Sequence, residues 1–131
     1  MSELPSDLKY AKTHEWVRVQ DDGTVTVGIS DHAQDQMGDM VYVEVPDTGR
    51  AVQAGEACAV VESVKSASDV YAPVSGEVVE SNAALSDHPE QVNQAPYEAG
   101  WLLRIRPSDP AELKHLMDVD GYRDFLATEE H

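Results

Sequence analysis

Short segments in which apolar and polar residues alternate follow one another along the chain, with turn-forming residues between them. Residues 14–20 (HEWVRVQ) and 24–30 (TVTVGIS) both alternate with a period of two, and Asp21-Asp22-Gly23 between them is typical of a turn. These two segments are predicted to form a hairpin. Further strands are expected within residues 40–46, 53–63, 75–81 and 100–106. The spacing predicts a mainly β fold, a barrel or sandwich of antiparallel strands.

Helices are expected only as short pieces around these strands. Ser30 or Asp31 is suited to cap a helix over residues 32–37, and Gly38 is suited to end it. Residues 82–96 have the composition of a polar loop.

Two more helical pieces are expected near the C-terminus, where they would cover one side of the sheets. Asp109 and Pro110 form a good helix start for residues 111–117 (AELKHLM). A second piece, residues 122–127 (YRDFLA), follows Gly121, which is expected to separate the two helices.

Length and charge limit the classes of protein that fit. The chain has 131 residues, 41% of them hydrophobic, which suits one domain over residues 1–131, with a sandwich core at about 10–107 and a helical cover at about 109–128. Nine basic and 25 acidic residues give a net charge of −16, which disfavours nucleic acid and anionic membranes as partners. No targeting pattern or membrane-spanning run is visible, so a cytoplasmic location is expected.

The sequence shows neither a metal site nor a catalytic constellation. Cys58 is the only cysteine, so an intramolecular disulfide and a multi-cysteine zinc site are excluded, and its small apolar neighbours indicate a half-buried bystander. The five histidines have no paired spacing typical of metal ligands, and His32, beside the predicted helix cap, is expected to be structural.

One lysine lies between two predicted strands, in residues 61–73 (VESVKSASDVYAP). If Val64 and Lys65 are the central pair of a tight turn, a face containing Ala57, Ala59, Val61, Ser68, Val70 and Ala72 packs inward, with residue 59 opposite 70 and 57 opposite 72. A type I′ turn is costly for β-branched Val64, so a turn without positive φ is expected. Lys65 then projects from the tip as a candidate attachment site, and the alternative is a solvated turn lysine. Arginine could not replace it as an acylation target, because the guanidinium stays protonated.

Several segments in order resemble the glycine cleavage H-protein family, and together they span nearly the whole chain. They are THEW (13–16), GISDHAQDQMGDMVYVEVP (28–46), ESVKSASDVYAPVSGEVVESN (62–82), NQAPYEAGWLLRI (93–105) and LMDVDGYRDFL (116–126). Two residues differ from those common in the family, Ser66 in place of alanine and Gly121 in place of a helix former. Neither difference affects the candidate attachment site at Lys65. The resemblance implies a lipoyl-domain-like barrel-sandwich hybrid of two antiparallel sheets with short peripheral helices, including C-terminal ones.

The resemblance also implies a non-catalytic carrier with lipoic acid in amide linkage to Lys65. It implies that the carrier receives an aminomethyl group from the pyridoxal-phosphate-dependent glycine decarboxylase (P protein). The tetrahydrofolate-dependent aminomethyltransferase (T protein) takes that group, and dihydrolipoamide dehydrogenase (L protein) reoxidises the dithiol. A lipoate ligase or lipoyl transferase is a further expected partner, and the tether raises the concentration of the reactive end at each docked enzyme.

Three carboxylates are candidates for contact with the arm or with the ligase. An aminomethylated arm carries a primary amine that is protonated near neutral pH, so a folded-back state favours nearby carboxylates. The expected register places Glu62 and Asp69 on one face near Lys65, and Glu15 in the THEW motif is the third candidate. The alternative for each is a merely solvated carboxylate.

Four other roles for Lys65 compete with this interpretation. A lipoyl domain of a 2-oxoacid dehydrogenase acyltransferase usually has an Asp-Lys-Ala core and a Pro/Ala-rich linker, and this sequence has neither. A biotin carrier typically has methionine on both sides of its lysine, whereas Val64 and Ser66 flank this one. A Schiff-base enzyme requires a lysine of lowered pKa in an enclosed apolar pocket, which a hairpin tip near carboxylates does not offer. An H-like protein that relays lipoyl groups to other acceptors stays open.

Overall fold

The computed structural model describes residues 7–129, in which strands dominate and short helices lie around them. The strands are β1 (Lys9–Tyr10), β2 (Glu15–Val19), β3 (Val25–Ile29), β4 (Met40–Glu44), β5 (Ala51–Val52), β6 (Ala57–Ser63), β7 (Ala67–Tyr71), β8 (Gly76–Ser81) and β9 (Leu103–Pro107). The α-helices are α1 (Asp31–Met37), α2 (Gln91–Gln94) and α3 (Val119–Glu129), and the 3-10 helices are η1 (Ala83–Ser86) and η2 (Pro110–His115).

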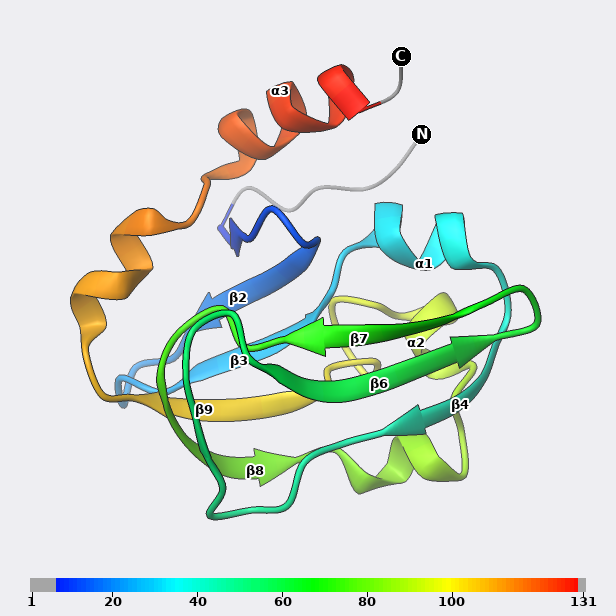
Figure 1. The fold of residues 1–131 in the computed structure, drawn as a ribbon, viewed down its shortest axis with the longest axis horizontal. Helices are drawn as coiled ribbons and strands as arrows, with labels where there is room; N and C mark the ends of the chain where they lie inside the picture. The colour runs from blue at the N-terminus through cyan, green and yellow to red at the C-terminus, as the bar shows by residue number, and fades with distance from the viewer. Residues whose placement is uncertain (1–6, 130–131) are drawn as a thin grey trace.

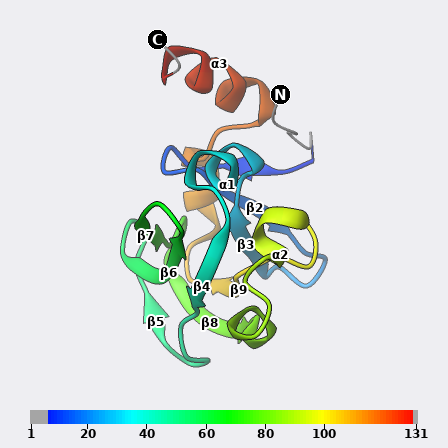
Figure 2. The same ribbon diagram turned by 90° about the vertical axis from the view of Figure 1, so that its right-hand side faces the viewer.

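The strands form two antiparallel sheets that face each other (Figure 1). One sheet has six strands in the order β1-β2-β3-β9-β8-β5, and the other has three in the order β4-β6-β7. Figure 2 shows the two sheets edge on, with β4, β6 and β7 beside the larger sheet. The predicted mainly β hybrid of barrel and sandwich is confirmed.

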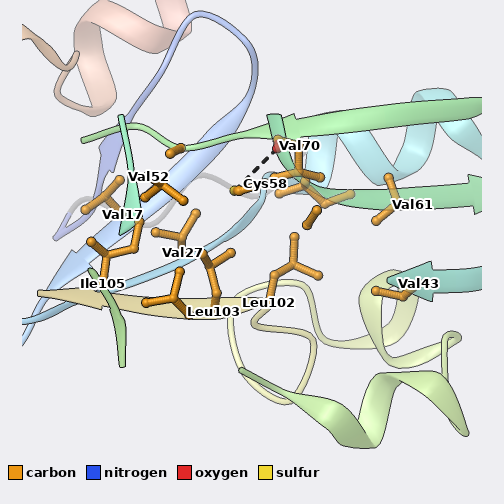
Figure 3. Close-up of a cluster of buried hydrophobic side chains, with 14 of the residues drawn as sticks. Val17, Val27, Val43, Val52, Cys58, Val61, Val70, Leu102, Leu103 and Ile105 are labelled. Carbon is orange, nitrogen blue, oxygen red and sulfur yellow. Dashed lines mark hydrogen bonds between the residues drawn. The ribbon is translucent and has the colours of Figure 1, made fainter. Parts of the chain in front are cut away.

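The main core fills the space between the sheets. Val17, Val27 and Ile105 of the larger sheet lie opposite Val61 and Val70 of the smaller one (Figure 3). All five side chains are almost fully buried. Burial of a side chain of this size contributes about 1.5–3 kcal/mol, so this layer holds the two sheets together.

A second cluster covers the opposite face of the larger sheet. It consists of Leu8, Tyr10, Trp16, Tyr97, Tyr122 and Leu126. The Trp16 ring lies across Gly28, where a Cβ atom would come within 2.6 Å of it, and the indole N–H donates to the Pro96 carbonyl at 2.9 Å. Both faces of β2 and β3 are therefore covered near this ring.

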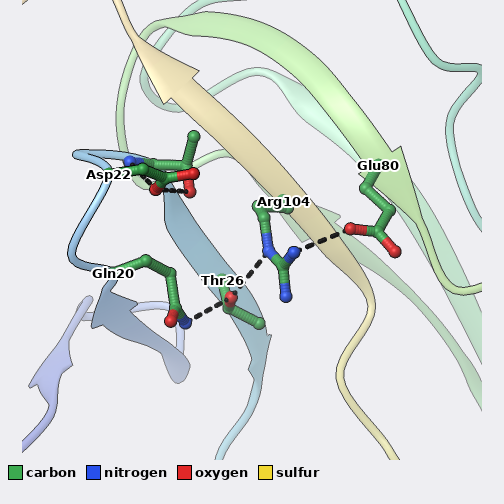
Figure 4. Close-up of polar contacts among 6 residues, drawn as sticks. Gln20, Asp22, Thr26, Glu80 and Arg104 are labelled. Carbon is green, nitrogen blue, oxygen red and sulfur yellow. Dashed lines mark hydrogen bonds and ion pairs between the residues drawn. The ribbon is translucent and has the colours of Figure 1, made fainter.

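Polar contacts connect neighbouring strands of the larger sheet. Arg104 on β9 donates to Glu80 on β8 at 2.7 Å and to the Thr26 hydroxyl on β3 at 3.2 Å (Figure 4). Gln20 donates to the same hydroxyl at 2.8 Å. Because exposed ion pairs add little free energy, we assign to Arg104 mainly a role in fixing the register of the three strands.

The predicted hairpin and the first helix are confirmed. β2 pairs with β3 from Glu15 opposite Ile29 to Val19 opposite Val25, and the turn between them includes Gly23 at a φ of 89°. Ser30 caps α1 by accepting from the Ala33 N–H. Gly38, at a φ of 84°, ends the helix.

The segment predicted as a polar loop, residues 82–96, contains short helices instead. Leu85 in η1 and Val92 in α2 are buried in the main core. Isolated apolar residues in a polar segment carry no periodic signal, so the pattern did not reveal that they anchor helical turns.

The prediction that Gly121 separates the C-terminal helices is wrong. Gly121 lies inside α3, and its N–H donates to the Asp118 carboxylate at 2.8 Å. The chain is extended at Leu116, and Met117 exchanges backbone hydrogen bonds with Tyr10. Pairing with β1 thus ends η2, and a capping aspartate starts α3.

The two C-terminal helices, which were predicted to cover one side of the sheets together, pack against different parts of the fold. Leu113 and Leu116 pack against the main core, whereas α3 packs against β1 at the edge of the larger sheet (Figure 2). The predicted division into one domain with core and cover stays a prediction. Among residues 7–129, no helix combines the length and the apolar character needed to span a membrane.

Candidate functional site

The β6–β7 hairpin has the predicted register over most of its length. Ala59 pairs with Val70 and Val61 pairs with Ser68. Ala57 was expected opposite Ala72, and this is wrong, because an irregularity between residues 57 and 59 places Ala57 opposite Tyr71. Extra residues of this kind leave no mark in a pattern of period two.

The same irregularity reverses the predicted facing of two residues. Cys58 points into the core beside Val70 (Figure 3) and is 5% exposed, whereas Ala57 is exposed. Ser68, also predicted to face inward, is exposed on the edge strand. Burial raises the pKa of the Cys58 thiol to about 12, so the thiolate, which is the reactive form, is disfavoured.

The hairpin tip is held by a serine hydroxyl. The Ser63 N–H donates to the Ser66 carbonyl at 2.7 Å, and the Ser63 Oγ accepts from the N–H groups of Lys65 and Ser66, both at 3.1 Å. Neither Val64 nor Lys65 has a positive φ, which excludes the type I′ turn as expected. The Ser63 hydroxyl accepts backbone hydrogen bonds within the turn, as an Asn or Asp side chain does in other turns. The position of Ser63 directly before Val64 and Lys65 could have suggested this role.

Lys65 is exposed at this tip, and its alkyl chain lies over Gly38 at the end of α1. A Cβ atom on Gly38 would lie 3.1 Å from the Lys65 Cε and 3.9 Å from Nζ. The last carbonyls of a helix carry partial negative charge, which favours an ammonium group there. The lysine is therefore accessible and has a defined resting direction.

A groove of about 650 Å³ lies next to this end of α1. Its walls combine apolar side chains with two of the three predicted carboxylates, Glu15 and Asp69. The lining residues are Thr13, His14, Glu15, Ile29, His32, Ala33, Gln36, Met37, Val61, Ser68, Asp69 and Val70. Met37, which lines the groove, directly precedes Gly38, the residue over which the Lys65 side chain lies.

The third predicted carboxylate, Glu62, is outside the set that lines the groove. Glu62 pairs with Ala67 on one side and with Tyr42 of β4 on the other. Its charge contributes to the raised pKa of the Tyr42 hydroxyl, after the larger effect of Glu44. Glu62 and Asp69 were expected to lie on one face near Lys65, but only Asp69 lines the groove.

Glu15 is almost fully buried in the wall of the groove. Its carboxylate accepts from the Thr13 hydroxyl and from the Tyr71 N–H, the latter at 3.2 Å. Burial raises the pKa of Glu15 from 4.5 to about 7, and these hydrogen bonds oppose the rise. The group can therefore gain or lose a proton near neutral pH when a charged group enters the groove.

A histidine in an unusual backbone conformation forms part of the same wall. His14 has a φ of 75°, a region that residues with side chains rarely adopt. The Tyr122 hydroxyl of α3 lies 2.7 Å from its Nδ1 and 2.7 Å from the Ser30 Oγ. His32, predicted to be structural, is buried with its ring 5.2 Å from the His14 ring. No local pattern in the sequence indicates that Tyr122 of α3 supports the groove in this way.

Within residues 7–129, no three His, Cys, Asp or Glu side chains gather in a way that could hold a metal ion. The hairpin tip offers an exposed amine, and the groove offers apolar side chains, the carboxylates of Glu15 and Asp69, and two imidazole rings.

This two-sheet fold, with a lysine at an exposed hairpin tip, has the architecture of the lipoyl-type carrier domains. Residues 8–129 match the family model described as glycine cleavage H-protein. The chain is 64% identical over 123 residues to the glycine cleavage system H protein of Methylococcus capsulatus, covering 94% of this chain and 96% of the relative. It is 58% identical over 130 residues to that of Alkalilimnicola ehrlichii, covering 99% and 100%.

The fold is also similar to a solved structure of such a protein. The crystal structure of a glycine cleavage system H protein from Mycobacterium marinum superposes with a TM-score of 0.85, at 36% identity, covering 98% of this chain and 100% of that one. The chain therefore belongs to the glycine cleavage H-protein family. Members of this family are carrier components of the glycine cleavage system rather than catalysts, and this chain is such a carrier.

Proposed function

We propose that Lys65 carries lipoic acid in amide linkage and that this arm shuttles the aminomethyl group of glycine. The observation that carries the proposal is the exposed Lys65 amine at a hairpin tip, in a chain of this family. Lys65 would hold the lipoyl group, whose disulfide would accept an aminomethyl group on one sulfur while glycine loses carbon dioxide at glycine decarboxylase. Aminomethyltransferase would pass the one-carbon unit to tetrahydrofolate with release of ammonia, and the flavin of dihydrolipoamide dehydrogenase would oxidise the remaining dithiol back to the disulfide. The cytoplasmic location expected from the sequence stays a prediction.

The groove suits such an arm in its resting position. Met37, Ala33 and Ile29 offer apolar surface along the groove, and Glu15 and Asp69 offer carboxylates. An aliphatic chain that ends in a protonated amine would contact both kinds of surface. On this proposal Glu15 loses its proton when the cationic end enters, because an adjacent positive charge favours the carboxylate.

The remaining surface suits transient docking. The net charge of −16 attracts basic patches on partners, and electrostatic attraction speeds encounter without requiring a large apolar interface. Glu62 is outside the groove wall and within three residues of Lys65, so we assign it to contact with the lipoate ligase or lipoyl transferase rather than with the arm.

Intact mass spectrometry after incubation with lipoate, ATP and a lipoate ligase tests the attachment site. We expect one lipoyl addition in the wild type, none in Lys65→Arg, and one in the control Lys12→Arg, whose lysine is also exposed. Addition that persists in Lys65→Arg, or no addition to a folded wild type, contradicts the proposal. A streptavidin blot would reveal biotin instead.

Glycine–bicarbonate exchange with a glycine decarboxylase then tests the shuttle. The lipoylated wild type should support exchange, and the unlipoylated protein should not. A lipoylated wild type that fails in exchange but donates its lipoyl group to other acceptors would favour the relay role.

A further inference from the structure

The hairpin tip that carries Lys65 contacts the turn between α1 and β4. The Val64 N–H donates to the Asp39 carbonyl at 3.0 Å. The Lys65 side chain lies over Gly38 in the same turn, with Cε 3.1 Å from the position of an added Cβ atom. Residues 38–40 therefore support both the backbone of the tip and the stem of the lysine.

A single side chain from another part of the fold holds this turn. Asn93, on α2, donates to the Gly38 carbonyl and to the Gln34 side chain, both at 2.9 Å, and accepts from the Met40 N–H at 2.8 Å. The amide thus uses both N–H donors and its oxygen on α1 and the turn. Since Gly38 and Met40 flank Asp39, these bonds fix the carbonyl on which the Val64 N–H depends.

The position of residue 38 also determines the direction of the lysine. Gly38 has a φ of 84°, and any side chain there would be strained and would press on the Lys65 stem. Without a side chain at this position, the Lys65 stem can lie against the turn at Gly38.

We propose that Asn93 is a positioning residue for Lys65, which acts by holding the turn of residues 38–40 against the hairpin tip. This proposal rests on the proposed lipoyl attachment at Lys65. Loss of the Asn93 amide leaves the tip without a fixed partner, so the acceptor amine spends less time in the orientation that the lipoylating enzyme requires.

Asn93→Ala tests the proposal, with Asn82→Ala as its matched control. Asn82 also donates two side-chain hydrogen bonds to backbone carbonyls, but far from the tip. We expect the Val64 amide to exchange with deuterium at least about tenfold faster in Asn93→Ala, while the Val78 amide keeps its wild-type rate in both variants. The kcat/KM of a lipoate ligase should fall about fivefold to twentyfold when Asn93→Ala replaces the wild type as its protein substrate. With the control Asn82→Ala it should fall less than about twofold.

If Asn93→Ala does not fold, the lipoylation rates of two further variants test the proposal. Asn93→Asp retains the acceptor for Met40 but loses the donors to the Gly38 carbonyl and the Gln34 side chain. It also places a carboxylate against these oxygens, so lipoylation should slow at least as much as in Asn93→Ala. Gly38→Ala leaves Asn93 intact and should slow lipoylation by disturbing the lysine stem.

The outcomes separate this proposal from the function on which it rests. If folded wild type is not lipoylated, the proposed function fails, whatever the exchange of the Val64 amide shows. If wild type is lipoylated and the folded Asn93 variants match Asn82→Ala in lipoylation rate, the positioning role is overturned and the proposed function stands.

Discussion

The buried carboxyl of Glu15 should make the stability of the protein depend on pH in a way that Glu15→Gln removes. Burial raises the pKa of Glu15 from 4.5 to about 7, so between these values the folded state binds more protons than the unfolded state. Folding stability therefore falls as pH rises through this window. The stabilisation is fully present below pH 4.5 and is lost as pH rises through about 7.

The size of the effect follows from the shift. A difference of 2.5 units between 4.5 and 7 corresponds to about 3 kcal/mol at 1.36 kcal/mol per unit. Gln has the same shape, accepts from the Tyr71 N–H through its carbonyl oxygen and carries no charge. The unfolding free energy of Glu15→Gln minus that of wild type should therefore increase by about 3 kcal/mol between pH 4 and pH 8.

Urea unfolding followed by circular dichroism at unit pH intervals measures this difference. Glu98→Gln serves as the control, because Glu98 is exposed and its replacement should leave the wild-type pH profile in place. Parallel curves for Glu15→Gln and wild type across pH 4–8, or a difference that decreases with pH, would refute the assignment of a raised pKa to Glu15.

Three other predictions follow from the packing. Gly28→Ala should lower the unfolding free energy by about 3 kcal/mol, because the new methyl group meets the Trp16 ring; urea unfolding measures this, and wild-type stability would contradict it. Tyr122→Phe should cost about 1–3 kcal/mol in the same assay, because the buried Ser30 hydroxyl loses a partner, and an unchanged midpoint would argue against that bond. The Cys58 thiol should react with an aromatic disulfide reagent at pH 8 about a thousandfold more slowly in the native protein than in urea, since burial raises its pKa from 9.0 to about 12; equal rates would show that it is accessible.

The parts of the fold that the sequence predicted well depend on local patterns. The β2–β3 hairpin follows from alternation and a turn signal, and α1 follows from Ser30 and Gly38 at its two ends. Each signal lies within the segment that it describes, so no knowledge of distant contacts is needed.

The wrong predictions fall where a distant contact decides the local structure. The break before α3 is set by the pairing of Met117 with Tyr10, more than a hundred residues earlier, rather than by Gly121. Cys58 is buried in place of Ala57 because the hairpin irregularity shifts the register. Neither effect has a signature in the segment itself.

The accessible lysine at the tip of a β hairpin could be predicted from local patterns, because strand alternation and turn position are local properties. Long-range packing, in contrast, brings Glu15 and Asp69 to a groove that Glu62 does not line, and places Asn93 where it holds the turn beneath Lys65. These residues lie in strands and helices far apart along the chain. They meet because two apolar sheet faces must be buried against each other, and that packing sets which polar side chains surround the lysine.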